Sequence, residues 1–208
     1  MRRWNKAAAG TPAERLVSEL RKHVADERVL EAIREVPRER FVAGGRRGEA
    51  WRNVALPIGL GQTISQPLVV ARMCELLELT GSERVLDVGT GSGYHAAVLA
   101  RLCGHVWSIE RHAELSRSAA QSLEAAGVQD VTLLVGDGGG GHPDAAPFDA
   151  INVGAAGRLP DALTAQLVDG GRLVAPVGDV DQRLTRLRRR GDGFEREAFE
   201  RVRFVPLV

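Results

Sequence analysis

The stretch Val85–Ala100, VLDVGTGSGYHAAVLA, decides the fold class of this 208-residue chain. Its first four residues are typical of a buried strand, and Tyr94–Leu102 has the composition of a helix. Gly89, Gly91 and Gly93 fill the turn between them. Glycine at such a turn lets the backbone approach a ligand closely and adopt positive φ. The unit therefore predicts a ligand-binding edge in an α/β fold.

The spacing of these glycines differs from that of the dinucleotide fingerprint. That fingerprint, G-x-G-x-x-G, places its third glycine three residues after the second. Here the third follows after two, and Tyr94 stands where the fingerprint has glycine. Asp87, just before the turn, would repel a pyrophosphate but suits a ligand with a cationic amino-acid end. S-adenosylmethionine is such a ligand, so we interpret the turn as part of a methyl-donor site.

Two further acidic residues follow predicted strands in the same way. The segment HVWSIE ends in Glu110, which comes 23 residues after Asp87. A Rossmann-type fold places a carboxylate on ribose hydroxyls at a spacing of about 20 residues. Asp137 follows the strand-like segment VTLLV, at a position suited to the adenine amino group. The predicted cofactor-binding residues are Asp87, Gly89, Gly91, Gly93, Glu110, Asp137 and Gly138.

The remaining chain alternates between helix-like and strand-like segments. Helices are predicted over 13–23, 27–36, 68–79, 113–126 and 160–168, and strands over 105–110, 131–135, 148–153, 172–176, 184–190 and 199–205. We expect a mobile loop over 44–48 and no regular element over 51–65, which is rich in Gly and Pro.

This pattern predicts an α/β, Rossmann-like methyltransferase fold with a mostly parallel, doubly wound sheet. The interpretation is one domain. It comprises an N-terminal helical lobe with a substrate loop (1–67), a cofactor-binding core (68–178) and antiparallel C-terminal strands (179–208).

Composition points to an ordinary cytoplasmic enzyme. The formal net charge of +1 provides no field that would direct the chain to nucleic acid or membrane. Cys74 and Cys103 are too few for a disulfide framework and lack metal-ligand spacing, so we expect buried free thiols and no metal. The N-terminal segment lacks the apolar core of a signal peptide, and no run reaches transmembrane length. Nothing in the sequence suggests an obligate assembly, and we expect a monomer.

The basic run Arg186–Arg190, RLRRR, has two possible interpretations. It is either a nucleic-acid patch or the solvated face of a strand. The near-neutral chain and the lack of interleaved aromatic residues favour the strand. The segment Asn152–Ala155 also lacks the N-P-P-Y-like pattern of nucleic-acid amino-methyltransferases. We therefore expect no nucleic-acid partner.

The segment Ala55–Pro67, ALPIGLGQTISQP, lies before the cofactor core, as a lid or substrate loop would. Together with VPRERFV at 36–42, PFDA at 147–150, PVG at 176–178 and RFVPLV at 203–208, it makes the chain resemble the protein-L-isoaspartate O-methyltransferase family. The resemblance spans nearly the whole chain. The QTIS loop and the FVPLV ending are its most specific parts.

The resemblance implies an activity and a set of residues. The activity is methyl transfer from S-adenosylmethionine to the free α-carboxylate of L-isoaspartyl residues in proteins or peptides. S-adenosylhomocysteine is released, and the ester collapses to a succinimide whose hydrolysis restores some normal aspartate. The family's active-site serine corresponds to Ser65, and its cofactor-binding acids correspond to Asp87, Glu110 and Asp137. The implied substrate loop comprises Ile64, Ser65, Gln66, Ala155 and Ala156.

The chemistry needs few groups. The substrate carboxylate is already ionised at neutral pH, so no strong base is required. The task is to align carboxylate oxygen, methyl carbon and sulfur, for which the hydroxyls of Thr63 and Ser65 are suited. Ser65 also has an ordinary structural interpretation as a helix N-cap, because Pro67 follows where a first helical turn tolerates proline. One exposed oxygen can serve both purposes.

Two departures from the family pattern leave alternatives open. Gly138–Gly141 are four consecutive glycines, and His142, interpreted as a loop residue at the rim of the site, replaces an aromatic residue. Gly157 and Arg158 stand where many members have proline. A specialised relative that methylates one dedicated peptide therefore remains an alternative to a general repair enzyme. A binding module that keeps the cofactor without catalysis is a third possibility, which the intact QTIS loop disfavours.

Overall fold

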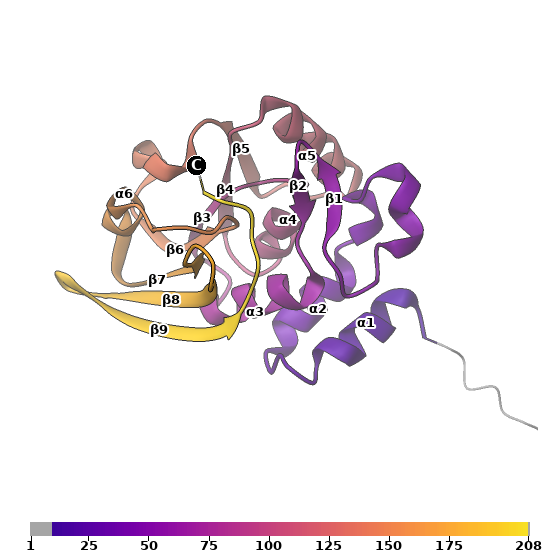
Figure 1. The fold of residues 1–208 in the computed structure, drawn as a ribbon, viewed down its shortest axis with the longest axis horizontal. Helices are drawn as coiled ribbons and strands as arrows, with labels where there is room; N and C mark the ends of the chain where they lie inside the picture. Colours follow the sequence, from indigo (N-terminus) through magenta and orange to yellow (C-terminus); the bar gives the residue numbers. More distant parts are fainter. Residues whose placement is uncertain (1–9, 208) are drawn as a thin grey trace, which may run out of the picture.

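A seven-stranded sheet forms the centre of the protein (Figure 1). The computed structural model describes residues 10–207. The strand order is β5-β4-β3-β6-β7-β8-β9. The strands are β3 (Arg84–Val88), β4 (His105–Glu110), β5 (Val131–Val135), β6 (Phe148–Val153), β7 (Leu167–Val177), β8 (Arg183–Arg190) and β9 (Gly193–Arg201). The strands β5, β4, β3, β6 and β7 pair in parallel, whereas β8 pairs antiparallel with both β7 and β9. This arrangement confirms the predicted fold class.

The order of the strands determines where a ligand can bind. The chain passes from β3 outward to β4 and β5, then returns to place β6 on the other side of β3. Open α/β sheets bind ligands at this point of reversal, beyond the carboxyl ends of the strands. The glycine turn (residues 89–93) leaves β3 at that point.

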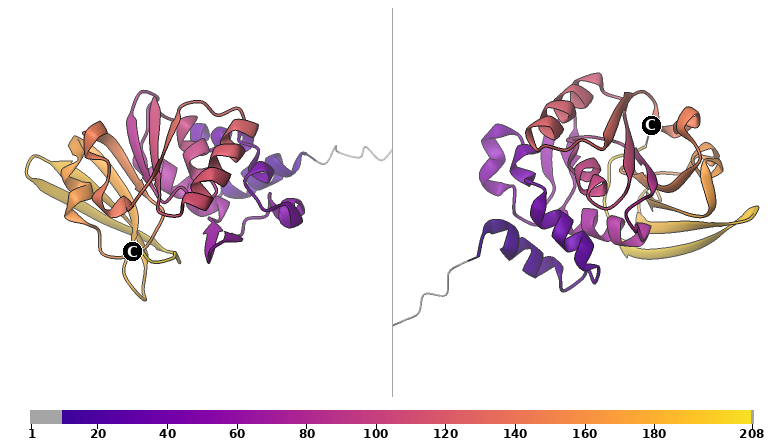
Figure 2. Two further views of the ribbon diagram at one scale, coloured as in Figure 1. Left: turned by 90° about the horizontal axis from the view of Figure 1, so that it is seen from above. Right: turned by 180° about the vertical axis from the view of Figure 1, so that it is seen from behind.

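Helices cover one face of the sheet closely and the other only thinly. The covered face carries α3 (Pro67–Leu77), α4 (Tyr94–Ala100) and α5 (Ala113–Ala125), with α1 (Pro12–Leu20) and α2 (Glu27–Glu35) packed outside them (Figure 2). The opposite face is covered by the short α6 (Asp161–Ala165) and neighbouring 3-10 turns. Within the described residues, both faces of the sheet are therefore covered, one by five helices and the other by one short helix and 3-10 turns.

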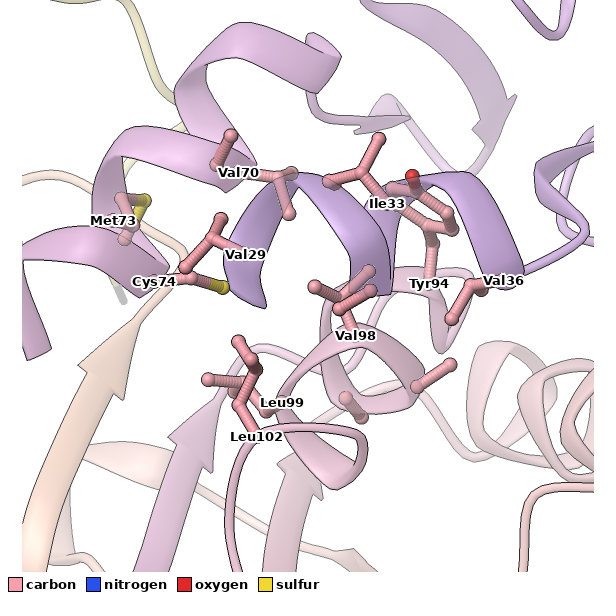
Figure 3. Close-up of a cluster of buried hydrophobic side chains, with 14 of the residues drawn as sticks. Val29, Ile33, Val36, Val70, Met73, Cys74, Tyr94, Val98, Leu99 and Leu102 are labelled. Atoms are coloured by element: carbon pink, nitrogen blue, oxygen red, sulfur yellow. The ribbon is translucent and has the colours of Figure 1, made fainter. Parts of the chain in front are cut away.

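The N-terminal lobe attaches to the core through an amphipathic helix. The Asp26 side chain caps α2 by accepting from backbone N–H groups at its start. Val29 and Ile33, one helical turn apart, are buried among side chains of α3 and α4 (Figure 3). Tyr94, the first residue of α4, points toward this helix. The lobe is therefore continuous with the core beneath the glycine turn.

The main error of sequence interpretation concerns residues 51–65. The structure places a small antiparallel hairpin there, β1 (Leu56–Gly59) and β2 (Gln62–Ile64). Gly59, Leu60 and Gly61 all have positive φ and form its turn. Contrary to the prediction from the sequence pattern, the glycines do not break regular structure here but make the tight connection between two strands.

Other elements lie where predicted, with shifted ends. The predicted helix over 160–168 shortens to α6 because β7 already begins at Leu167. The last predicted strand is displaced, since β9 ends at Arg201. The loop over 44–48 is a 3-10 turn, Gly44–Glu49. Among the residues described, no helix combines the length and apolar character needed to cross a membrane.

The basic run lies on β8, as the strand interpretation predicts. Arg186 and Arg188 both form ion pairs with Glu78, the C-cap residue that follows α3. Arg186 also pairs with Glu197 on β9. These arginines therefore join the antiparallel hairpin to α3.

Candidate active site

A cavity of about 910 Å³ opens at the carboxyl ends of the parallel strands. Its floor includes the glycine turn and the end of β4, and β2 forms one wall. Residues 201–207, which we call the C-terminal strap, form a further part of the wall. The predicted site residues that line it are Thr63, Ile64, Ser65, Gln66, Gly89, Gly91, Glu110, Gly138 and Ala155. One cavity thus unites predicted residues from the substrate loop and the cofactor edge.

The three glycines of the turn have two different structural roles: two line the cavity, and one allows close helix packing. All three have positive φ: 96° at Gly89, 54° at Gly91 and 85° at Gly93. Gly89 and Gly91 line the cavity. Gly93 does not; a Cβ added there would lie 3.2 Å from that of Ala119 on α5. The third glycine therefore permits close helix packing rather than ligand contact.

Asp87 lies beneath the cavity and not on its wall. In the sheet register it stands between Ser108 on β4 and Asn152 on β6, so all three side chains share one face. Its carboxylate accepts from Ser108 Oγ and from Asn152 Nδ2, both at 2.7 Å. The residue is fully buried, and this burial raises the pKa of Asp87 to about 6 against the opposing effect of the two hydrogen bonds.

The same network extends to a histidine that sequence reasoning overlooked. Asn152 Nδ2 also lies 3.2 Å from His95 Nδ1, and His95 Nε2 lies 3.5 Å from the Cys74 sulfur. His95 borders the cavity. Burial lowers the pKa of His95 to about 3, so the ring is neutral at physiological pH. Only the fold brings this helix residue beside Asn152; its position in the sequence gives no such signal.

Glu110 ties the glycine turn to β4. One carboxylate oxygen accepts from the Gly91 N–H at 2.8 Å and the other from the His112 N–H at 2.9 Å. Glu110 lines the cavity although its side chain is buried. This is the position from which a Rossmann-type carboxylate contacts ribose hydroxyls.

The adenine side of the predicted site is built largely from backbone. Asp137 is exposed, does not line the cavity and accepts from the Gly139 N–H at 2.8 Å. Gly138 does line the cavity, and a Cβ there would lie 2.5 Å from Val88 Cγ1. His142 is outside the described cavity wall, with its N–H bonded to Gln166.

Two positions of the glycine run differ in how much room they leave for a side chain: Gly138 is crowded and Gly140 is open. We expect Gly138→Ala to lower the free energy of unfolding by about 1–3 kcal/mol through overpacking against Val88, and to weaken cofactor binding. Gly140→Ala is the matched control, because a Cβ there meets nothing within 4 Å. Denaturant unfolding and cofactor titration measure both effects. Equal results for the two variants would contradict the assignment.

The substrate loop leads directly into α3. Gln66, not Ser65, occupies the N-cap position, and no side chain caps the helix. The interpretation of Ser65 as the N-cap is therefore wrong, and Ser65 precedes the cap. Its side chain is free of that structural duty and borders the cavity.

The C-terminal strap closes the site through backbone contacts. The Ala156 N–H donates to Val205 O at 2.8 Å, and the Leu207 N–H donates to Ala156 O at 2.7 Å. Ala156 itself is buried and, unlike Ala155, does not line the cavity. The Gln182 amide brackets Phe204, donating to its O at 3.2 Å and accepting from its N–H at 2.6 Å. Sequence reasoning noted the RFVPLV ending as a motif, but not as a wall of the site.

The comparisons with known proteins agree with this geometry. A family model described as "Protein-L-isoaspartate(D-aspartate) O-methyltransferase (PCMT)" matches residues 11–208. The chain belongs to this family.

In the part of the chain that the structure describes, no group of three or more His, Cys, Asp or Glu side chains gathers as a metal site.

Similar proteins include bacterial protein-L-isoaspartate O-methyltransferases. That of Cronobacter sakazakii is 54% identical over 195 residues, covering 93% of this chain and 94% of the relative. That of Klebsiella pneumoniae is 54% identical over 197 residues, covering 94% and 95%. Membership confirms that the protein is an enzyme and that S-adenosylmethionine is its methyl donor. It also confirms the predicted activity, methylation of L-isoaspartyl residues.

Solved structures give the same fold. A protein-L-isoaspartate O-methyltransferase superposes with a TM-score of 0.86 at 27% identity, and the match covers 93% of this chain and 65% of that one. A Plasmodium falciparum protein, titled a putative protein-L-isoaspartate O-methyltransferase in complex with S-adenosyl-L-homocysteine, has a TM-score of 0.82 at 23% identity. That match covers 96% of this chain and 99% of the other.

Proposed function

We propose that the cavity is the methyl-transfer site of a general L-isoaspartyl repair enzyme, with Ser65 and Thr63 holding the substrate carboxylate. One observation carries this proposal: the QTIS loop and the glycine turn line the same cavity. The proposal keeps a single methyltransferase domain with three segments (1–67, 68–178 and 179–208). Of the described residues, those of the first segment contribute the substrate wall, those of the second the cofactor floor, and those of the third the C-terminal strap.

The residues at the floor fit S-adenosylmethionine. Gly89 and Gly138 bring bare backbone to the cavity, and a side chain at Gly138 would collide with Val88. Glu110 offers a carboxylate at the ribose position. The buried carboxylate of Asp87 places negative charge beneath the floor, on the side suited to an ammonium group. Asp137 remains the predicted partner of the adenine amino group.

The chain's own residues then perform a positioning task. When bound, the sulfonium donor supplies a methyl group already activated for displacement. Thr63 and Ser65 offer hydroxyl donors that hold the substrate carboxylate in line with that methyl group. The neutral His95 is not needed as a base, because the attacking carboxylate is already ionised.

The walls beside the substrate loop favour general repair over one dedicated peptide. Small residues, Ala55 and Ala155, border the cavity there. Such a surface contacts a peptide main chain and offers little selection between side chains. Peptides that carry one isoaspartyl residue among varied neighbours test this. We expect kcat/KM to vary less than about tenfold between them, whereas activity on a single flanking sequence would indicate a dedicated substrate.

Partners and location follow from the same proposal. The partners are isoaspartyl-containing proteins and peptides, and we propose a monomer that binds neither nucleic acid nor membrane. Cys74 and Cys103 are both buried free thiols, which suits a reducing compartment such as the cytoplasm.

A further inference from the structure

A fully buried arginine lies behind the substrate loop. Arg38 opens the 3-10 turn Arg38–Arg40 after α2, and its side chain is 0% exposed. Its Nε donates to Ala50 O at 2.9 Å, and its Nη2 donates to Ser65 O at 2.8 Å. One guanidinium thus joins the segment before β1 to the residue placed at the centre of the reaction.

The charge of Arg38 is held without a carboxylate. Among the residues described, none forms an ion pair with it; its guanidinium carbon lies 4.5 Å from the centre of the Tyr94 ring. Its Nη1 is buried without a hydrogen-bond partner in the same set, and burial lowers the pKa of Arg38. An unpaired buried charge is costly, and carbonyl and ring contacts offset only part of that cost. Stability alone is therefore a poor explanation for a cation here.

The bond to Ser65 fixes the orientation of one peptide group. Arg38 is buried and does not line the cavity, so the Ser65 carbonyl points into the protein. In a trans peptide the following N–H points the opposite way. The Gln66 N–H therefore faces the cavity side, and it has no protein acceptor among the described residues. It stands at the N-terminus of α3, where the helix dipole favours an anion.

We propose that Arg38 is a positioning residue for methyl transfer. By holding the Ser65 carbonyl inward, it presents the Ser65 hydroxyl and the Gln66 N–H together to the substrate carboxylate. This inference rests on the proposed role of Ser65. It adds a backbone donor and a residue, far from the loop in sequence, that sets the geometry of both.

The first test is Arg38→Lys, which keeps the charge but cannot reach both carbonyls with a planar fork. We expect kcat to fall about tenfold and KM for an isoaspartyl peptide to rise, while the Kd for S-adenosylmethionine changes less than about twofold. Arg38→Gln, which removes the desolvated charge and keeps one amide donor, is the second variant. It should show the same pattern. Unchanged kcat in a folded variant would overturn the proposal.

Arg172 supplies a matched control. It is a partly buried arginine whose Nε and Nη2 donate to Leu77 O at 2.7 Å and Glu78 O at 3.0 Å, away from the cavity. We expect Arg172→Lys to lower the thermal midpoint without changing kcat. If it lowers kcat per folded molecule as much as Arg38→Lys does, the role of Arg38 is merely structural and the proposal fails.

A double-mutant cycle separates this inference from the role of Ser65. Ser65→Ala removes the hydroxyl but keeps the Ser65 carbonyl and the Gln66 N–H. If Arg38 acts through this peptide group, Arg38→Lys should therefore cost clearly less activity in a Ser65→Ala background than in the unmodified protein. Fully additive losses would contradict the inference while leaving the role of Ser65 intact. A normal rate for Ser65→Ala alone would instead overturn the proposed role of Ser65.

Discussion

We expect Ser65→Ala to lower the turnover number about 100-fold and to leave the Kd for S-adenosylmethionine unchanged. The side chain borders the cavity and is not the cap of α3, so its removal should disturb alignment rather than folding. Misplacement of a reacting group by about 1 Å costs a factor of this size. Single-turnover kinetics and calorimetric titration with the cofactor measure the two quantities.

Ser118→Ala is the matched control for this substitution. Ser118 is an exposed serine on α5 and is not part of the cavity wall. It should behave as the unmodified protein in both measurements. A rate for Ser65→Ala within twofold of the control would remove Ser65 from the mechanism.

Cofactor affinity should fall as the pH drops through about 6. Burial raises the pKa of Asp87 to about 6, and a bound ammonium group would keep this carboxylate ionised at lower pH. The free protein then takes up a proton that the complex does not. Affinity is therefore complete above pH 6 and is lost below it, by at most about tenfold per pH unit.

The neighbours of Asp87 do not account for this change of cofactor affinity with pH. The negative charge of Glu110 contributes to the raised pKa of Asp87, while His95, with a pKa of about 3, stays neutral throughout. Calorimetric titrations between pH 5 and 7 measure the slope. Asp87→Asn should bind about tenfold more weakly at pH 7 and show a flat profile.

Asp149→Asn is the control for the pH experiment. Asp149 is on β6, at the end away from the cavity, where it accepts from the Arg84 N–H. Its variant should keep the full pH dependence. If Asp87→Asn keeps it as well, Asp87 is not the titrating group and its proposed electrostatic role is wrong.

The sequence identified the edge of the sheet at which the cavity opens, but not the direction of every side chain there. Asp87 is the last residue but one of β3, and Glu110 is the last residue of β4. The sequence pattern therefore predicts the same role for both. In the structure the register pairs Asp87 with Ser108 and Asn152, which removes its oxygens from the cavity, whereas Glu110 turns toward the glycine turn. Direction at a strand end depends on neighbours that only the fold supplies.

Tertiary proximity also explains the residues that were overlooked. His95 and the C-terminal strap enter the cavity wall through contacts between segments far apart in the chain. The β1–β2 hairpin was overlooked because its glycines are equally typical of irregular loops. The helices and parallel strands were predictable because apolar periodicity and caps are local properties.

The most direct test of the whole account is a methyl-transfer assay on paired peptides that differ only in an L-isoaspartyl or L-aspartyl linkage. The account predicts transfer to the isoaspartyl member of each pair, whatever the neighbouring residues, and almost none to the aspartyl member. Equal transfer to both members, or none to either while S-adenosylmethionine still binds, would contradict it.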